Sequence, residues 1–336
     1  MKAITIAQAG GVENLILTTV EKPVLKENEV LVETKAISIN PVDFKIRSAE
    51  PGLNMMYGEQ RPAILGWDIS GTVSQIGNKV TNFKVGDNVF GMVNFPGNGA
   101  AYAEFVASPE DHLAKMPKNI SFEDAAAATL AALTALQVLE TRIKKDDRIL
   151  IHAGSGGVGH FAIQIAKAMG AYVITTSSAK NKELVMGFGA DEHIDYTTQK
   201  IEEVVSDLDF VFDMFNGDIL LKSIGLVKSG GTIMSLPTPD FSDEITTLAK
   251  ERNVNVTNLL VQSSSDEITT LAKERNVNVT NLLVQSSAKD MHTLSKMLED
   301  GTLTSHVSET FSFEDLNKAH KHLESGRTVG KVIVKL

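Results

Sequence analysis

The chain has 336 residues, of which 43% are hydrophobic and 22% are charged, and its formal net charge is −10. This composition is typical of a soluble globular protein long enough for two domains. The negative charge and the lack of a basic run argue against a nucleic-acid partner. Because the chain contains no cysteine, it has no disulfide, no thiolate nucleophile and no cysteine ligand for a metal.

The chain begins MKAITIAQAGG, which leads into a strand pattern and contains no apolar signal core. No stretch reaches 18 apolar residues, so we expect neither a membrane span nor a membrane partner. A cytoplasmic protein is the expectation from these features.

The first 120 residues alternate short strand patterns with turns. Strands are predicted at Lys2–Gln8, Glu29–Ile39, Gly71–Ile76, Asn88–Val93, Ala103–Ala107 and His112–Lys115. Strands with this spacing are typical of a small β-barrel or sandwich. From Phe122 the pattern becomes helical, and the alanine-rich stretch Ala125–Leu139 predicts one buried helix.

A glycine-rich turn follows the strand predicted at Ile149–His152. The sequence GSGGVG, residues 154–159, supplies the three glycines of G-x-G-x-x-G, and a helical pattern follows it. In this strand–turn–helix order, the turn's amides are expected to face the phosphates of a dinucleotide, at the positive end of the helix dipole. The residues expected to contact the phosphates are Gly154, Ser155, Gly156, Gly157 and Val158. A glycine turn of some other α/β protein is the alternative.

The end of the next predicted strand, Tyr172–Thr176, indicates which dinucleotide is bound. An NAD site usually has an Asp or Glu there, which binds the ribose hydroxyls. This chain instead has TTSSAKNK, a run without a carboxylate. Its hydroxyl and ammonium groups, including those of Ser177, Ser178 and Lys182, would bind a 2′-phosphate. We therefore expect NADPH rather than NADH.

Strand and helix patterns alternate after the glycine turn. Strands are predicted at Tyr172–Thr176, His193–Asp195, Phe210–Met214 and Thr232–Leu236, with helices at Lys182–Phe188 and Ile219–Leu226. This alternation predicts a doubly wound parallel sheet, in which ligands bind beyond the carboxyl ends of the strands. Asn216 and Leu236 lie at such strand ends.

An identical repeat interrupts this pattern. Ser242–Ser264, SDEITTLAKERNVNVTNLLVQSS, recurs without a change at Ser265–Ser287. Solenoid repeats diverge and occur in three or more copies, so this pair is a recent duplication or a deliberate insertion. Each copy predicts a short helix followed by a strand, at residues 254–261 or 277–284.

The two copies compete for one place in the fold. We expect one copy to fill it and the other to extend, exchange or disorder the edge of the sheet. The second copy continues directly into the helix predicted at Ala288–Leu298, and this continuity favours the second copy as the occupant.

The order of several motifs resembles one protein family. In chain order they are NPVDFKIR at 40–47, GWDISGTV at 66–73, VTNFKVGDNV at 80–89, the alanine-rich helix and the glycine turn. Together they resemble the zinc-independent quinone oxidoreductase group of the medium-chain dehydrogenase/reductase superfamily. NPVDFKIR resembles its branch of plant enone oxidoreductases and chloroplast-envelope quinone oxidoreductase-like proteins. The resemblance covers essentially the whole chain and implies hydride transfer from NADPH to a quinone or an α,β-unsaturated carbonyl compound.

The resemblance also implies an α/β fold with two domains. A GroES-like β-barrel catalytic domain is expected at 1–122 and 308–336. A Rossmann domain with a doubly wound parallel sheet is expected at 123–307, and it contains both repeat copies. In relatives, the strand matching the repeat lies at the sheet edge and pairs across a dimer. A homodimer through strand 254–261 or 277–284 is therefore expected.

The zinc sites of this superfamily have no counterpart here. Zinc alcohol dehydrogenases bind the metal through a Gly-His-Glu segment and cysteines, whereas this chain has Gly66-Trp67-Asp68 and no cysteine. Trp67 cannot bind zinc and would more ordinarily form core or pocket wall. We therefore expect no metal.

Without a metal, hydrogen-bond donors must stabilise the negative charge that develops on the carbonyl oxygen. Lys45 is the first candidate, because the matching lysine of enone reductases lies beside the nicotinamide and the substrate. Asn40 and Tyr57 are further candidates. The ordinary alternatives are a solvated lysine, an asparagine in a turn and a loop tyrosine. Asp43 would either orient Lys45 or cap a helix.

The resemblance implies three further cofactor contacts. Thr134 matches a residue that contacts the nicotinamide carboxamide, Tyr196 one near the adenosine, and Lys331 one near the cofactor phosphates. The alternative functions are a nonenzymatic NADPH-binding protein of the crystallin kind, or a variant whose activity the duplication has impaired.

Overall fold

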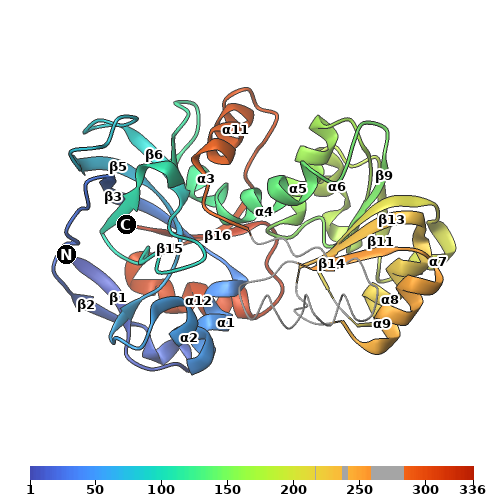
Figure 1. Cartoon of the computed structure of the whole chain (residues 1–336), viewed down its shortest axis with the longest axis horizontal. Coiled ribbons are helices and arrows are strands. Elements are labelled where there is room, and N and C mark those ends of the chain that lie inside the picture. The colour runs from blue at the N-terminus through green and yellow to red at the C-terminus, as the bar shows by residue number, and fades with distance from the viewer. Residues whose placement is uncertain (216, 237–240, 259–283) are drawn as a thin grey trace. The chain divides into compact units, whose positions relative to one another are not determined.

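The computed structural model describes residues 1–215, 217–236, 241–258 and 284–336. The chain forms two compact units (Figure 1). The first unit contains Met1–Leu133 and Gln285–Leu336, and the second contains Thr134–Val284.

The bounds of these units differ from those expected, because two helices pack on the first unit. Helix α3 (Phe122–Ala127) lies on its strands, and the Ser70 hydroxyl donates to the Phe122 carbonyl over 2.6 Å. Helix α11 (Ala288–Glu299) is held in the same unit, where the Ser295 hydroxyl donates to the Lys115 carbonyl over 2.8 Å.

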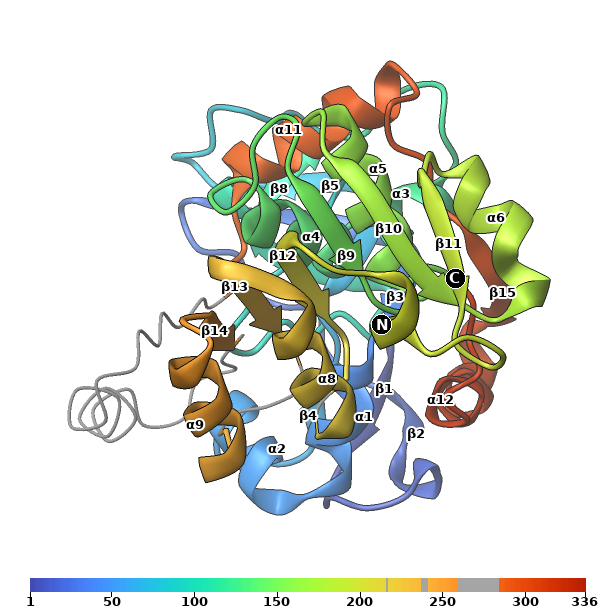
Figure 2. The same cartoon turned by 90° about the vertical axis from the view of Figure 1, so that its right-hand side faces the viewer.

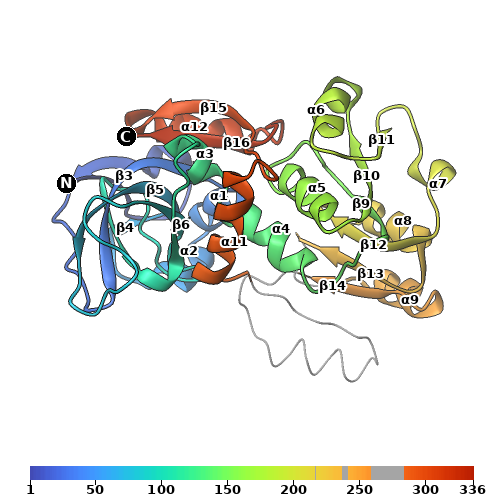
Figure 3. The same cartoon turned by 90° about the horizontal axis from the view of Figure 1, so that it is seen from above.

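The first unit contains two sheets within the described residues. The larger has the order β15-β16-β3-β5-β6-β8, with β7 also paired to β3, and the smaller has the order β2-β1-β4. The larger sheet comprises β3 (Glu29–Ile39), β5 (Asp68–Ile76), β6 (Asn88–Met92), β7 (Phe105–Pro109), β8 (Leu113–Lys115), β15 (Val307–Ser312) and β16 (Lys331–Lys335). The smaller comprises β1 (Lys2–Ile6), β2 (Ile16–Thr19) and β4 (Ala63–Ile64). Figure 3 shows the C-terminal strands β15 and β16 beside α12 (Leu316–Glu324).

All six strands predicted in this unit are present, but its first helices were not predicted. Helices α1 (Pro41–Ser48) and α2 (Glu50–Tyr57) follow β3. A turn was the ordinary alternative given for Asn40, but proline also fits the first position of a helix, where its missing N–H costs nothing.

The single helix predicted at Ala125–Leu139 is wrong. The chain forms α3 and then a separate helix, α4 (Leu130–Leu139). The Asp68 carboxylate accepts a hydrogen bond from the Leu130 N–H over 3.0 Å, so a side chain from β5 caps the second helix and permits the break.

The second unit contains a fully parallel sheet with the strand order β11-β10-β9-β12-β13-β14 among its described residues. The strands are β9 (Arg148–Ile151), β10 (Tyr172–Ser177), β11 (Glu192–Asp195), β12 (Leu208–Asp213), β13 (Val227–Ser235) and β14 (Asn255–Asn258). The helices are α5 (Gly159–Ala168), α6 (Lys182–Gly187), α7 (Ile201–Val204), α8 (Asp218–Leu226) and α9 (Asp243–Glu251). Figure 2 shows α5 and α6 on one face of the sheet and α8 and α9 on the other. This order reverses between β9 and β12 and confirms the predicted doubly wound sheet.

The first repeat copy fills the edge of this sheet, so the preference for the second copy was wrong. Its helix is α9 and its strand β14 pairs in parallel with β13, placing Val256 beside Ile233. Only residues 236–242 separate β13 from this helix, and a shorter connection costs less entropy to close. Most of the second copy, residues 265–283, lies outside the described residues.

The end of the second copy belongs to the first unit. Ser286 forms two hydrogen bonds with the backbone of Phe95, one through its N–H and one through its hydroxyl, at 3.1 and 2.9 Å. Ser287 caps α11 by accepting from the Asp290 N–H over 3.2 Å. The two copies therefore supply different ends of the same 23-residue sequence to the described fold.

Candidate functional site

The glycine turn presents unpaired amides at the start of α5. In the described part of the chain, the N–H groups of Ser155, Gly157 and Val158 have no hydrogen-bond acceptor. The turn is closed by other bonds, from the Gly156 N–H to the Ala153 carbonyl and from the Gly154 N–H to the Thr176 carbonyl. Three free donors at the positive end of a ten-residue helix suit a phosphate group.

The three motif glycines serve different purposes. A Cβ at Gly154 would lie 1.9 Å from the Thr175 hydroxyl oxygen, and one at Gly159 would lie 2.2 Å from the Ala153 carbonyl oxygen. The turn packs so closely against its neighbours that both positions require glycine. At Gly156 an added Cβ would lie 3.1 Å from the Ala153 carbonyl oxygen, a tight contact but a milder one, and the second glycine of this motif typically lets a pyrophosphate approach the backbone.

The end of β10 carries a connected set of polar groups. The Ser177 hydroxyl lies 2.8 Å from His193 Nε2, and Asn181 Nδ2 donates to the Ser155 hydroxyl over 3.0 Å. Ser178 is half-buried and Lys182 is exposed. Burial lowers the pKa of His193. These groups adjoin the glycine turn, and His193 and Asn181 were not among the residues named for the 2′-phosphate.

The remaining sequence-predicted residues of the second unit are dispersed. Thr134 is buried on α4, Tyr196 is 64% exposed after β11, and the Leu236 N–H donates to the Asp213 carbonyl over 3.0 Å. Asn216 lies outside the described residues.

Two buried ionisable residues at the strand ends were also missed. Asp213 ends β12, where it accepts from the Ser235 hydroxyl over 2.8 Å and from the Phe215 N–H over 3.1 Å. Burial raises its pKa to about 7. His152 follows β9 and contacts the hydroxyls of Thr176 and Ser223, and burial lowers its pKa to about 4. In the sequence, both residues can be recognised as ionisable side chains at the end of an apolar strand.

In the first unit, Asn40 lies in a buried polar cluster. Its Nδ2 donates to an Asp68 carboxylate oxygen over 2.8 Å, and its Oδ1 accepts from the Lys331 ammonium. Asp43 accepts from the Asn40 backbone N–H, so the capping alternative for Asp43 is the one observed. Burial raises the pKa of Asp43 to about 8.

The positions of Asn40 and Lys331 differ from those expected. Asn40 is 2% exposed and Lys331 is 3% exposed, so neither side chain is open to a ligand in this structure. The Lys331 ammonium, expected near the cofactor phosphates, instead donates to Asn40 and to the Ile39 carbonyl. In the sequence, this cluster could have been recognised from the charged residues Asp68 and Lys331, which begin the apolar strands β5 and β16.

Lys45 and Tyr57 have contrasting environments. Lys45 projects from α1 as an exposed side chain, with no ion pair among the described residues. Tyr57 is buried at the end of α2, and its hydroxyl accepts from the Gly66 N–H over 3.1 Å, which leaves its own proton free to donate. Burial raises the pKa of Tyr57 well above its usual value, so the phenol stays protonated.

Tyr57 belongs to a row of aromatic rings. Its ring centroid lies 5.7 Å from that of Trp67, which contacts Phe95 edge-on at 5.2 Å. Trp67 is fully buried and its indole N–H donates to the Gly97 carbonyl over 2.6 Å. Trp67 is therefore part of the core, and Ser286 of the second repeat copy holds the backbone of Phe95.

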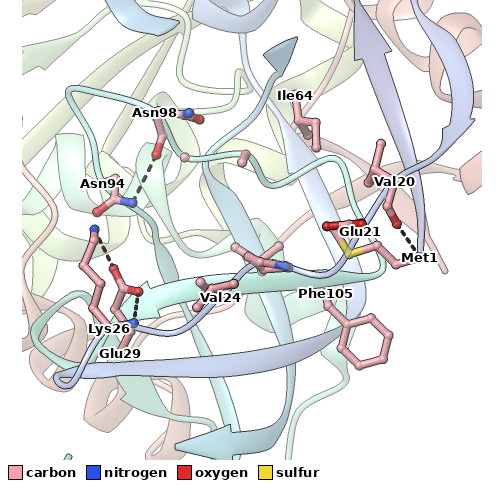
Figure 4. Close-up of a pocket in the computed structure, with 15 residues that line it drawn as sticks. Met1, Val20, Glu21, Val24, Lys26, Glu29, Ile64, Asn94, Asn98 and Phe105 are labelled. Carbon is pink, nitrogen blue, oxygen red and sulfur yellow. Dashed lines mark hydrogen bonds and ion pairs between the residues drawn. The ribbon is translucent and has the colours of Figure 1, made fainter. Parts of the chain in front are cut away.

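The first unit also has an open pocket of about 580 Å³ (Figure 4). Val20, Val24 and Phe105 line it, and Lys26 and Glu29 form an ion pair of 3.0 Å at one side. None of the sequence-predicted site residues lines this pocket.

Neither a metal-binding cluster nor a membrane-spanning helix is present among the described residues. They contain no group of three or more His, Cys, Asp or Glu side chains placed to hold a metal ion. No described helix is long and apolar enough to cross a membrane.

Two family models match parts of the chain. Residues 26–118 match the alcohol dehydrogenase GroES-like domain, and residues 188–334 match a model described as zinc-binding dehydrogenase.

Curated relatives are oxidoreductases. The NADPH-dependent alkenal/one oxidoreductase of Arabidopsis thaliana is 36% identical over 245 residues, which are 70% of this chain and 62% of the relative. The chain thus spans less than two thirds of that protein. The mitochondrial NAD(P)H oxidoreductase RTN4IP1 of Danio rerio is 30% identical over 332 residues, which are 92% of this chain and 84% of the relative.

Solved structures match over the whole chain. A quinone oxidoreductase from Coxiella burnetii has a TM-score of 0.85 and 33% identity, covering 100% of this chain and 99% of that one. Mycobacterial Rv1454c, solved with NADPH, has a TM-score of 0.80 and 27% identity, covering 100% of both chains.

Proposed function

Because the chain belongs to the medium-chain dehydrogenase/reductase superfamily, among its quinone and enone oxidoreductases, we propose that it transfers hydride from NADPH to a quinone or an α,β-unsaturated carbonyl compound. The observation that carries this proposal is the set of three unpaired amides at the start of α5. They adjoin a strand end rich in hydroxyl groups and free of carboxylates. A 2′-phosphorylated dinucleotide fits this donor set.

NADPH, when bound, supplies the hydride. Ser155, Gly157 and Val158 would hold its pyrophosphate, and Ser177, Ser178 and Lys182 its 2′-phosphate. Lys45 would stabilise the negative charge that develops on the substrate oxygen, because its ammonium is exposed and unpaired in the described chain. Tyr57 would supply a proton, because its phenol remains protonated. In its bond with Gly66 the phenol oxygen accepts, so the phenol proton stays available.

The test is NADPH oxidation, followed by absorbance, with 1,4-benzoquinone, 9,10-phenanthrenequinone, 1-penten-3-one and trans-2-hexenal as acceptors. We expect turnover with enones, and about a tenfold or greater loss of kcat in Lys45→Ala. Lys118→Ala is the matched control, because Lys118 is an exposed lysine of the same unit outside the predicted site. If quinones alone react and Lys45→Ala is unaffected, Lys45 loses its role. Tight NADPH binding without turnover would instead favour a binding protein or a variant whose activity the duplication has impaired.

We further propose a homodimer formed through β14. This strand pairs with β13 and lies at the edge of the described sheet, and an edge strand offers backbone groups to another chain. Size-exclusion chromatography with light scattering should give twice the chain mass of 36.3 kDa. A monomer at micromolar concentration would contradict this assembly.

A further inference from the structure

The Asn40 cluster consists of Asn40, Asp43, Asp68 and Lys331, which meet in the interior of the first unit. Their exposed fractions lie between 0 and 3%. They come from four places in the chain: Asn40 follows β3, Asp43 lies in the first turn of α1, and Asp68 and Lys331 begin β5 and β16. The sheet brings them together, because β3 pairs with both β5 and β16.

The charges of this cluster fix the orientation of the Asn40 amide. An ammonium group can only donate hydrogen bonds and a carboxylate can only accept them. Lys331 therefore faces the amide oxygen and Asp68 faces the amide nitrogen, 2.8 Å away. Turning the amide over would place donor against donor and acceptor against acceptor.

The same cluster holds the first turn of α1. The Asn40 N–H donates to the Asp43 carboxylate, and the Asp43 N–H donates to the Asn40 carbonyl over 3.0 Å. Asn40 is thus held through its side chain by Asp68 and Lys331 and through its backbone by Asp43. Lys45 lies on the following part of this eight-residue helix, so its position depends on how the first turn is held.

Asp68 also anchors a second helix. Its other carboxylate oxygen accepts from the Leu130 N–H, the first amide of α4, over 3.0 Å. One buried carboxylate therefore joins the starts of α1 and α4. Burial raises the pKa of Asp68, and the Lys331 ammonium is the largest opposing influence.

Stability alone is a weak reason for such an arrangement. Burying charged groups costs desolvation free energy that well-packed apolar side chains of similar volume avoid. A charged cluster does provide directional contacts, and here these contacts end on the helix that carries the exposed Lys45.

We propose that Asp68 and Lys331 are positioning residues for hydride transfer, which hold Lys45 in place through Asn40 and the first turn of α1. This inference rests on the proposed function, in which Lys45 acts on the substrate. Neither residue contacts the substrate in this proposal.

A double-mutant cycle between Asp68 and Lys45 tests the proposal. Asp68→Asn should lower kcat by about tenfold in the wild-type background and by less than about twofold in Lys45→Ala. The loss of Tm caused by Asp68→Asn should be the same in both backgrounds. An equal loss of kcat in both backgrounds would show a purely structural role and overturn the proposal. Lys331→Arg should restore kcat relative to Lys331→Met, because arginine retains the cationic donor.

A second measurement does not depend on turnover. Hydrogen exchange of the α1 amides, residues 42–48, should become about tenfold faster in Asp68→Asn, while exchange in β1 stays unchanged. Unchanged protection of α1 would overturn the proposal. Lack of turnover in the wild-type protein would refute the proposed function, and exchange would still show whether the cluster holds α1. Asp68→Asn/Lys331→Met, which removes both charges together, serves if Asp68→Asn does not fold.

Discussion

The Asn40 amide nitrogen donates to the Asp68 carboxylate over 2.8 Å, although 28 positions separate the two residues. The same residue begins α1, where its backbone N–H donates to the Asp43 carboxylate. A residue that appears in the sequence as ordinary turn chemistry is therefore part of the interior of the first unit.

The coenzyme preference should change when a carboxylate is placed after β10. Ser178→Asp is expected to raise KM for NADPH by about tenfold or more, because the new charge repels a 2′-phosphate. KM for NADH should change little. Steady-state kinetics with both dinucleotides measures the ratio. Ser206→Asp, an exposed substitution before β12, is the control for added negative charge. Equal increases for both dinucleotides would contradict the assigned phosphate site.

Gly159→Ala should impair both the turn and dinucleotide binding. Its Cβ would lie 2.2 Å from the Ala153 carbonyl oxygen and 2.8 Å from the Gly154 Cα, so the turn must move. We expect the Kd for NADPH, measured by fluorescence titration, to rise by about tenfold or more. Gly187→Ala is the matched control, since nothing lies within 4 Å of its added Cβ. It should stabilise α6 by up to about 1 kcal/mol. Normal NADPH affinity in Gly159→Ala would show that this close contact is unimportant.

Asp213 should make stability depend on pH. Burial raises its folded-state pKa from 3.8 to about 7, so the native state keeps a proton that the unfolded state loses near pH 4. The free energy of unfolding should therefore fall as pH rises from about 4 to 7, with a contribution of about 1.4 kcal/mol per pH unit at most. Asp213→Asn should flatten this part of the profile, measured by urea unfolding. Asp207→Asn, an exposed substitution just before β12, is the control. An unchanged slope in Asp213→Asn would refute this assignment.

Removing one repeat should leave the described contacts intact. In the resulting chain of 313 residues (336 − 23), Gln262–Ser264 replaces Gln285–Ser287 with the same sequence. We expect a free energy of unfolding within about 1–2 kcal/mol of that of the full chain, because loop closure depends weakly on length. A loss of several kcal/mol would mean that the second copy has a structural role.

One substitution should have different effects in the full chain and in the chain that lacks one repeat copy. Val256 is 1% exposed on β14, so Val256→Asp should cost about 3 kcal/mol or more in the shortened chain. It should cost less in the full chain, where Val279 of the second copy offers an identical replacement strand. Chemical unfolding compares the two, with Val279→Asp in the full chain as the control. Equal losses in both chain lengths would show that the second copy cannot substitute.

The sequence predicted the features that depend on local pattern. Apolar runs and turn residues were sufficient for the parallel strands, and Gly154 and Gly159 indicated their turn because each answers a local steric need. The Asn40 cluster depends on strand pairing between distant segments. Nothing near Lys331 in the sequence shows that its ammonium meets Asn40, 291 positions away.

Two errors have the same origin. The break between α3 and α4 depends on the Asp68 carboxylate, which lies 62 positions before Leu130. The choice between repeat copies could not be made from their identical sequences, and the short connection from β13 decides it in favour of the first copy. Neither the remote contact nor the effect of the connection's length is visible in the local sequence pattern.

The described fold uses different parts of the two repeat copies, so a deletion can reverse the duplication. The sheet uses the beginning of the first copy, and the first unit uses the end of the second. Any in-frame deletion of 23 residues that begins between Ser242 and Ser265 yields the same shorter protein. Many independent deletions thus converge on one product, which retains a beginning and an end for the same two sets of contacts. Selection for a shorter chain would not need to rebuild either the edge of the sheet or the start of α11.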